Sequence, residues 1–364
     1  MRTGSEALVS GRRNIAAKAP PATAVLFWVL LGIAALVGVV GCDRDARATA
    51  ERADAELRVI EIRGTRRGPT VAFVAGVHGG KVAAVNALER LAGELDPDAV
   101  VGTVLIVAPA NLAGFRAGLA QLSPDDSLNL NRVFPGNEDG RPTERLAARI
   151  MKAVVARSDY LVDLHGSDGD ESVGRFAYAA RPGIDPRVDS AARALAVAWG
   201  VPLIVWDDAG PRTLAESRFL QTAAHLSGVP AITVFEAGET REDSSATTAF
   251  VAGARRTLYQ LGVLDASMEQ IDPLATDTSA IEVAVLPRRS VALAERDGVW
   301  NPVVRAGARV RRGELLGTVV DSLTSTLRPL RAQADGIVLH QRHGGDVAAA
   351  TPVVILGVIP ATRP

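Results

Sequence analysis

The sequence predicts an α/β fold, in which a mostly parallel mixed sheet carries helices on both faces and a small all-β barrel or sandwich follows at the C-terminus. Two observations predict it. From Leu57 to about residue 271, apolar runs of strand length alternate with amphipathic runs of helix length. After Asp272 the chain changes to short β-rich runs punctuated by glycines.

The predicted strands of the α/β part are nearly continuous in apolar residues, which is typical of parallel strands covered on both faces. They are Thr70–Gly76, Thr103–Ala108, Tyr160–Leu164, Val201–Trp206 and Ala231–Phe235. The predicted helices are Val82–Leu95, Thr143–Ala156, Ser190–Trp199, Leu214–Leu226 and Thr247–Leu261. Ligands of such sheets bind beyond the carboxyl ends of the strands, so we expect the site there.

The C-terminal part, residues 272–364, is expected to form a separate β domain. Its predicted strands are Ile281–Leu286, Val303–Val304, Leu315–Val320, Gly336–Leu339 and Val353–Val358. The segment Arg305–Gly317 resembles the hairpin of biotinyl- and lipoyl-type domains, but it has no lysine at an exposed turn to carry such a cofactor. We therefore interpret this domain as a packing or substrate-gating module.

Composition limits the classes of function. The 364 residues have a formal net charge of −1, so there is no basic excess to neutralise nucleic-acid phosphates, and nucleic acid is not expected as a partner. The single cysteine, Cys42, excludes an intrachain disulfide and a cysteine-based zinc cluster. A histidine metal site must draw on five histidines.

Residues 1–41 are typical of an export leader, because basic residues precede an uncharged apolar run, Ala24–Gly41. The run ends in Val39–Cys42, which resembles the lipobox of bacterial lipoproteins, where the cysteine is lipidated and becomes the mature N-terminus. An uncleaved signal anchor is the alternative. In both cases residues 42–56 form a tether, and the catalytic domain, residues 57–271, lies outside the cytoplasm at a membrane. Asp43 resembles the signal that retains lipoproteins at the inner membrane.

Three chemically reactive side chains directly follow predicted strands. His78, His165 and Glu236 occupy these strand ends. Neutral imidazoles, an open position for water and a nearby carboxylate are what a hydrolytic zinc site requires. Asp163 points to the same side of its strand as His165 and could accept the other imidazole N–H.

Four motifs in order resemble the succinylglutamate desuccinylase and aspartoacylase family, relatives of the zinc carboxypeptidases, over roughly residues 57–358. They are GVHGGK from Gly76, NLNRVFPG from Asn129, DLH from Asp163 and PAITVFEAG from Pro230. The resemblance implies the zinc carboxypeptidase-like fold with its C-terminal domain. It also implies Zn²⁺ on His78 and His165, Glu236 as the catalytic base and acid, and a substrate carboxylate held by Asn131 and Arg132.

The sequence departs from the family pattern at three positions. Lys81 stands where the family has a metal-binding glutamate, and Asn129 replaces the aspartate of DLNR. The expected arginine falls at Ala120, although Arg116 could bind the substrate in its place. A lysine beside a dication would weaken or expel the metal unless the side chain turned away.

Two functions therefore remain. The first is zinc-dependent hydrolysis of an acyl-amide bond, in second place an ester, in a small N-acyl amino acid or peptide-like substrate. The second is a carboxylate-binding lipoprotein on the same scaffold without turnover, which Lys81 favours. The other histidines are interpreted as structural or surface residues; they are His225, His340 and His343.

Overall fold

The structure is a computed structural model that describes residues 57–208, 210–237, 240, 242–264 and 284–360. The predicted leader and tether, with Cys42, lie outside these residues. Among the helices that are described, none combines the length and the apolar character needed to cross a membrane.

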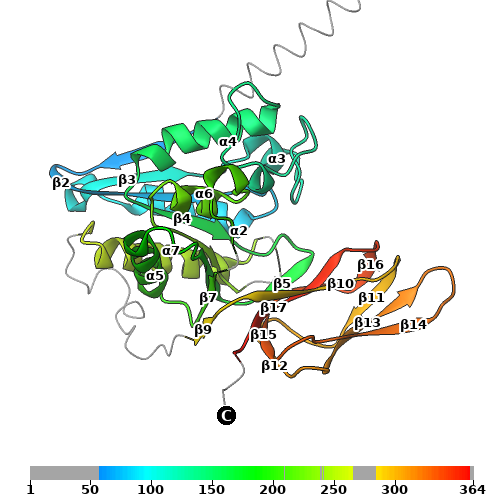
Figure 1. Cartoon of the computed structure of the whole chain (residues 1–364). Coiled ribbons are helices and arrows are strands. Elements are labelled where there is room, and N and C mark those ends of the chain that lie inside the picture. Colours follow the sequence, from blue (N-terminus) through cyan, green and yellow to red (C-terminus); the bar gives the residue numbers. More distant parts are fainter. Residues whose placement is uncertain (1–56, 209, 238–239, 241, 265–283, 361–364) are drawn as a thin grey trace, which may run out of the picture. The chain divides into compact units, whose positions relative to one another are not determined.

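An eight-stranded mixed sheet forms the centre of the α/β part (Figure 1). Its strands in spatial order are β1 (Ile60–Arg63), β3 (Val101–Val107), β2 (Arg66–Ala75), β4 (Tyr160–His165), β8 (Ala231–Phe235), β6 (Phe176–Ala180), β7 (Leu203–Asp207) and β9 (Ala284–Leu286). The pairs β1–β3 and β6–β8 are antiparallel, and the others are parallel. The central strands β2, β4 and β8 therefore end at the same edge.

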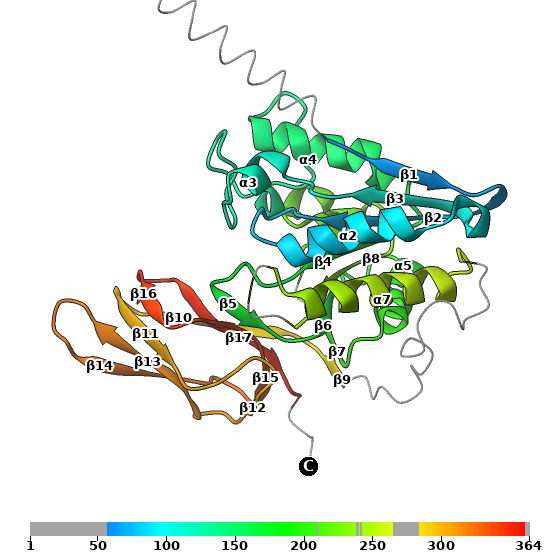
Figure 2. The ribbon, with the colours of Figure 1, turned by 180° about the vertical axis from the view of Figure 1, so that it is seen from behind.

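Helices cover both faces of this sheet, as Figures 1 and 2 show from opposite sides. On one face the helices are α2 (Val82–Glu94), α5 (Pro186–Trp199) and α7 (Ser244–Gln260), which share a core with Phe73 and Trp199. On the other face they are α4 (Pro142–Ala153) and α6 (Leu220–Leu226), packed around Leu105 and Phe134. The predicted fold class is confirmed, since burial of both sheet faces explains the continuous apolar strands.

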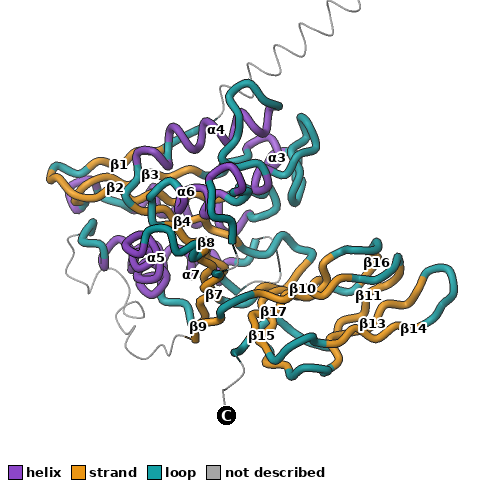
Figure 3. The backbone as a smooth tube through the Cα atoms, in the orientation of Figure 1, coloured by secondary structure: helices purple, strands orange, loops and turns teal. Residues whose placement is uncertain are grey.

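The C-terminal part contains two further sheets (Figure 3). Trp300 is fully buried in the core that they share. One has the order β10 (Arg289–Leu293), β17 (Pro352–Val358), β15 (Gly336–Arg342) and β12 (Arg309–Val310), and β15 also pairs with β5 (Glu171–Val173). The other has the order β14 (Leu327–Arg331), β13 (Leu315–Asp321), β11 (Gly298–Pro302) and β16 (Gly345–Val347).

Two strands cross the expected boundary between the domains. The first described strand after it, β9, joins the main sheet beside β7, whereas β5 of the α/β part joins the β domain through β15. A small apolar cluster that contains Phe176, Val205 and Leu339 fills the space between the two parts. The β domain is therefore held firmly against the α/β part at the edge where the site lies.

Several element bounds differ from the sequence prediction. Residues Leu214–Leu226 form a short 3₁₀ turn (Leu214–Glu216) and then α6, with a break between them. Val303 and Val304 follow β11 and belong to no strand. In the α/β part the strands β1, β5 and β6 were not predicted, and in the C-terminal part β10, β11, β12, β14 and β16 were not predicted. Strand β5 is only three residues long, too short for an alternating pattern to reveal it.

Candidate functional site

The structure brings His78 and His165 together beyond the ends of β2 and β4. Their ring centroids lie 5.2 Å apart and their planes are nearly perpendicular. Both side chains are buried, at 8% and 4% exposed. Residues at successive strand ends of a parallel sheet meet at one edge, which is why two histidines 87 positions apart face each other.

Each imidazole is held by a side-chain oxygen on its Nε2 atom. Nε2 of His78 lies 3.0 Å from Oδ1 of Asn129, an oxygen that also accepts the backbone N–H of Asn131. Nε2 of His165 lies 3.0 Å from Oδ2 of Asp163. Because both oxygens accept hydrogen bonds, the Nε2 atom of each ring is the donor, and Nδ1 is the nitrogen left for another partner. Burial, then the charges of His165 and Lys81, hold the pKa of His78 well below its usual value, so this ring is neutral.

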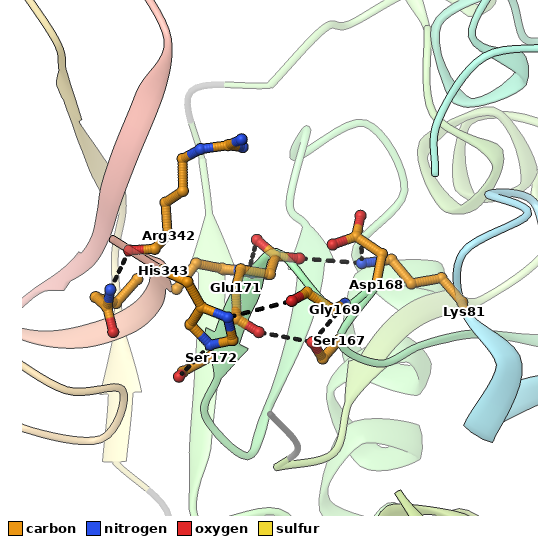
Figure 4. A network of polar contacts seen from close by, with 10 residues as sticks. Lys81, Ser167, Asp168, Gly169, Glu171, Ser172, Arg342 and His343 are labelled. Carbon is orange, nitrogen blue, oxygen red and sulfur yellow. Dashed lines mark hydrogen bonds and ion pairs between the residues drawn. The ribbon is translucent and has the colours of Figure 1, made fainter. Parts of the chain in front are cut away.

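Lys81 lies in the same cavity and is bound by two carboxylates (Figure 4). Its Nζ atom lies 3.0 Å from Oε1 of Glu171 and 3.4 Å from Oδ2 of Asp168. The Lys81 side chain is 5% exposed. The other oxygen of Glu171, Oε2, lies 3.2 Å from Nδ1 of His340 in the β domain. Burial would raise the pKa of Glu171, but the opposite charges of Lys81 and His340 outweigh it and lower the pKa.

Asp168 lies in the loop after β4 and Glu171 begins β5, and this segment is held by contacts on both sides (Figure 4). Nδ1 of His343 donates to the carbonyl of Gly169 at 3.1 Å, and the Ser172 hydroxyl lies 3.1 Å from Nε2 of the same ring. On the opposite side the loop touches the first motif, where a Cβ on Gly80 would lie 2.6 Å from Cβ of Asp168. The glycine is therefore required for the close approach of Asp168 to Lys81.

Glu236 does not line the cavity that holds His78 and His165, in contrast to the position expected of a catalytic base there. Its carboxylate is fully buried and accepts from Nε of Arg175 at 2.6 Å and from Nε1 of Trp199 at 2.9 Å. His165 and Phe235 are register partners on β4 and β8, and Phe235 lines the cavity with His165. Successive residues at a strand end point to opposite sides, so Glu236 is directed away from the imidazoles.

The cavity has a volume of about 170 Å³ and is rich in cations. Arg132 lies over the ring of Phe219, and Arg289 lies 4.1 Å from the ring centroid of Tyr178. Burial and the nearby charge of Arg289 lower the pKa of Arg132. Asn131 also lines the cavity, and its Oδ1 atom accepts the N–H of Leu220, which leaves the amide NH₂ for a ligand.

Arg116 does not line the cavity, contrary to the sequence prediction. It ends the short helix α3 (Leu112–Arg116) and is exposed, while Gln121 from the following loop reaches the cavity instead. Several cavity residues were not singled out from the sequence, among them Glu171, Tyr178 and Arg289. His340 was interpreted as a structural or surface residue, but it lines the cavity and contacts Glu171. Arg289 and His340 come from the β domain, so no motif near His165 points to them.

These residues fit a zinc ion only in part. The two Nδ1 atoms are donors of the kind that zinc binds. The position where the family has the third metal ligand, however, holds the Lys81 ammonium. The carboxylates nearest to it, Glu171 and Asp168, are bound to that ammonium. Within the described residues no three His, Cys, Asp or Glu side chains are grouped so that they could hold a metal. His225 is buried against Asp189 at 2.8 Å, as a structural residue.

Comparison with known proteins agrees with this architecture. Residues 67–258, more than half of the chain, match the model of the succinylglutamate desuccinylase/aspartoacylase catalytic domain. The chain belongs to this family of deacylases, which act on N-acyl amino acids and generally depend on zinc.

Individual relatives are distant but extend over most of the chain. The N-alpha-acetyl-L-2,4-diaminobutyric acid deacetylase of Halomonas elongata is 27% identical over 80% of this chain and 83% of that protein. The product-bound ectoine utilization protein EutE (DoeB) of Ruegeria pomeroyi is 26% identical, with a TM-score of 0.71 over 83% of this chain and 88% of that one. A succinylglutamate desuccinylase/aspartoacylase from Rhodobacter sphaeroides shares the fold, with a TM-score of 0.71 and 23% identity over 82% of this chain and 88% of that one.

Proposed function

We propose that this protein is a membrane-tethered, extracytoplasmic member of the deacylase family whose cavity binds a small N-acylated amino acid through its carboxylate. The observation that carries the proposal is the guanidinium of Arg132. In the part of the chain that the structure describes, no carboxylate pairs with it, although it faces a small cavity beside a second arginine. A planar guanidinium binds a ligand carboxylate in two parallel hydrogen bonds.

The rest of the cavity suits the acyl and side-chain parts of such a ligand. Phe219, Phe235 and Tyr178 provide aromatic surface, and Asn131 provides an amide for a carbonyl oxygen. A wider space of about 510 Å³ adjoins the cavity and shares Arg132 and His340 with it. Longer peptide-like ligands, such as cell-wall peptide fragments, would extend into it.

Calorimetric titration with matched acids and amides tests this proposal. N-acetyl-L-aspartate, N-succinyl-L-glutamate and N-acetyl-L-2,4-diaminobutyrate are compared with their C-terminal amides. We expect the acids to bind at least about 10-fold more tightly, because the amides lack the charge that Arg132 contacts. Arg289 adds a second cation, so the ligands with an acidic side chain should bind more tightly than the diaminobutyrate derivative.

Two variants make the titration specific. Arg132→Ala should lower affinity for every acid, whereas Arg289→Ala should mainly remove the preference for acidic side chains. Arg187→Ala, on the exposed side of α5, is the matched control and should bind like the wild type. Equal affinity for acids and amides would contradict the proposal.

Zinc-dependent hydrolysis of the acyl-amide bond is the second candidate. The paired imidazoles favour it, and so does the deacetylase activity named for the Halomonas elongata relative. It requires Glu236 to leave Arg175 and Trp199. If Glu236 is the base, Glu236→Gln abolishes hydrolysis while the fold persists. If it is a structural group, the variant loses about 1.5–3 kcal/mol of unfolding free energy and ligand affinity is unchanged. Product analysis by mass spectrometry and urea unfolding together distinguish the two roles.

A further inference from the structure

We infer that the Lys81 ammonium replaces the metal ion, so that the site binds its ligand without zinc. The ammonium lines the same cavity as His78 and His165 and supplies the positive charge that a bound dication would otherwise supply there. This concerns the metal alone and does not depend on which ligand the cavity binds.

The Lys81 ammonium lies where it would meet a metal ion bound to the histidines. Lys81 is the residue before α2 and follows His78 by three positions, in the tight turn that brings both side chains into the cavity. A zinc ion bound to the Nδ1 atoms would lie in this cavity with the ammonium. Two positive charges a few ångströms apart repel strongly where little water screens them.

Lys81 is not free to turn away from the metal position. Glu171 and Asp168 hold its Nζ atom at 3.0 and 3.4 Å, and the side chain is almost completely buried. Removing the ammonium from this position would leave two carboxylates close together without the cation that they share, which is strongly unfavourable in a poorly solvated site.

The surrounding carboxylates do not replace the missing glutamate as ligands for zinc. Glu171 uses one oxygen for Lys81 and the other for His340, and Asp168 faces the same ammonium. Of the two acidic residues in the motifs, Asp163 contacts Nε2 of His165, and Glu236 is bound to Arg175 and Trp199. The two carboxylates beside Lys81 are therefore arranged around an organic cation.

Zinc titration of the full-length chain tests this inference without any organic ligand. Protein is dialysed against buffered zinc, metal content is measured by inductively coupled plasma mass spectrometry, and affinity by calorimetry. We expect no stoichiometric zinc on the wild type. Lys81→Glu should bind one equivalent, at least ~100-fold more tightly than the wild type, because an anionic ligand replaces a cation.

Matched variants identify the cause of any gain in zinc affinity. Lys81→Gln removes the charge without adding an anionic ligand, and it should bind zinc much more weakly than Lys81→Glu. Adding His165→Ala to Lys81→Glu should abolish binding. If Lys81→Glu does not fold, the wild type still decides the question. One equivalent of zinc on the wild type, lost in His78→Ala, would overturn the inference, as would equal zinc affinity in Lys81→Gln and Lys81→Glu.

Discussion

Lys81 and Glu171 show how single residues determine the character of this site. A buried lysine is tolerated only where carboxylates compensate its charge, and here Glu171 and Asp168 do so. Glu171 in turn connects the first motif with His340 of the β domain. The lysine at the position of the family's glutamate is thus accompanied by carboxylates that compensate its charge.

The stability that Glu171 provides should depend on pH. Its pKa is lowered in the folded protein, from an ordinary value of 4.5, because Lys81 and His340 outweigh the effect of burial. Below about pH 4.5 the unfolded chain therefore binds more protons than the folded chain, and stability falls as the pH falls. Asp168 also faces Lys81 and retains part of the charge balance when Glu171 is changed.

Urea unfolding of wild type and Glu171→Gln between pH 7 and pH 3 measures this contribution. We expect the variant to be less stable by about 1–3 kcal/mol at pH 7. The difference should decrease below about pH 4.5, whereas the exposed Glu89→Gln control should show little difference at any pH. A difference that stays constant down to pH 3 would mean that the charge of Glu171 is not the stabilising feature.

At the scale of elements, the pairing of β5 with β15 joins the two parts of the site. Gly174 N–H donates to Leu339 and His343 N–H donates to Asp170, and these bonds flank the pair Ser172 and Gln341. Since hydrogen-bonded pairs alternate along an antiparallel ladder, Ser172 and Gln341 exchange both backbone bonds. Glu171 and His340 lie beside this pair, so its geometry determines theirs.

Ser172→Pro should therefore disturb the site through the backbone. Proline removes the N–H of residue 172 from the ladder, and we expect a loss of about 2 kcal/mol or more of unfolding free energy. Weaker binding of the N-acylated acids should accompany it. Ser172→Ala, which keeps the ladder and removes only the hydroxyl contact to His343, should cost about 1 kcal/mol. Ligand binding unchanged in the proline variant would show that β5 does not position the site.

At the scale of the whole molecule, the site is completed by residues far apart in the sequence. The α/β part provides both imidazoles and Arg132, and the β domain provides Arg289 and His340. Because β9 belongs to the main sheet and β5 to a sheet of the β domain, the two parts support each other. A β domain that only packed beside the α/β part would not explain these shared strands.

The proposed location of the protein gives a prediction about its N-terminus. If the Val39–Cys42 segment is processed as a lipobox, residues 1–41 are removed and Cys42 carries lipid. Mass spectrometry of the membrane-extracted protein should then find a lipidated N-terminal Cys42, and Cys42→Ser should accumulate as an unprocessed precursor. An intact leader on the wild type would instead indicate an uncleaved signal anchor.

The sequence by itself determined the alternation of strands and helices, and with it the edge where His78 and His165 meet, because strand ends of a parallel sheet converge whatever the loops do. Asn131 and Arg132 lie in a 3₁₀ turn of a loop, and only the family motif associated them with this site. Tertiary structure decided which side of its strand Glu236 faces, since a motif match carries no information about side-chain direction beyond the last strand residue. It also decided the partners of Lys81. Glu171, which binds Lys81, is joined to His340 through a pairing of strands about 170 positions apart, and such long-range contacts leave no local pattern in the sequence.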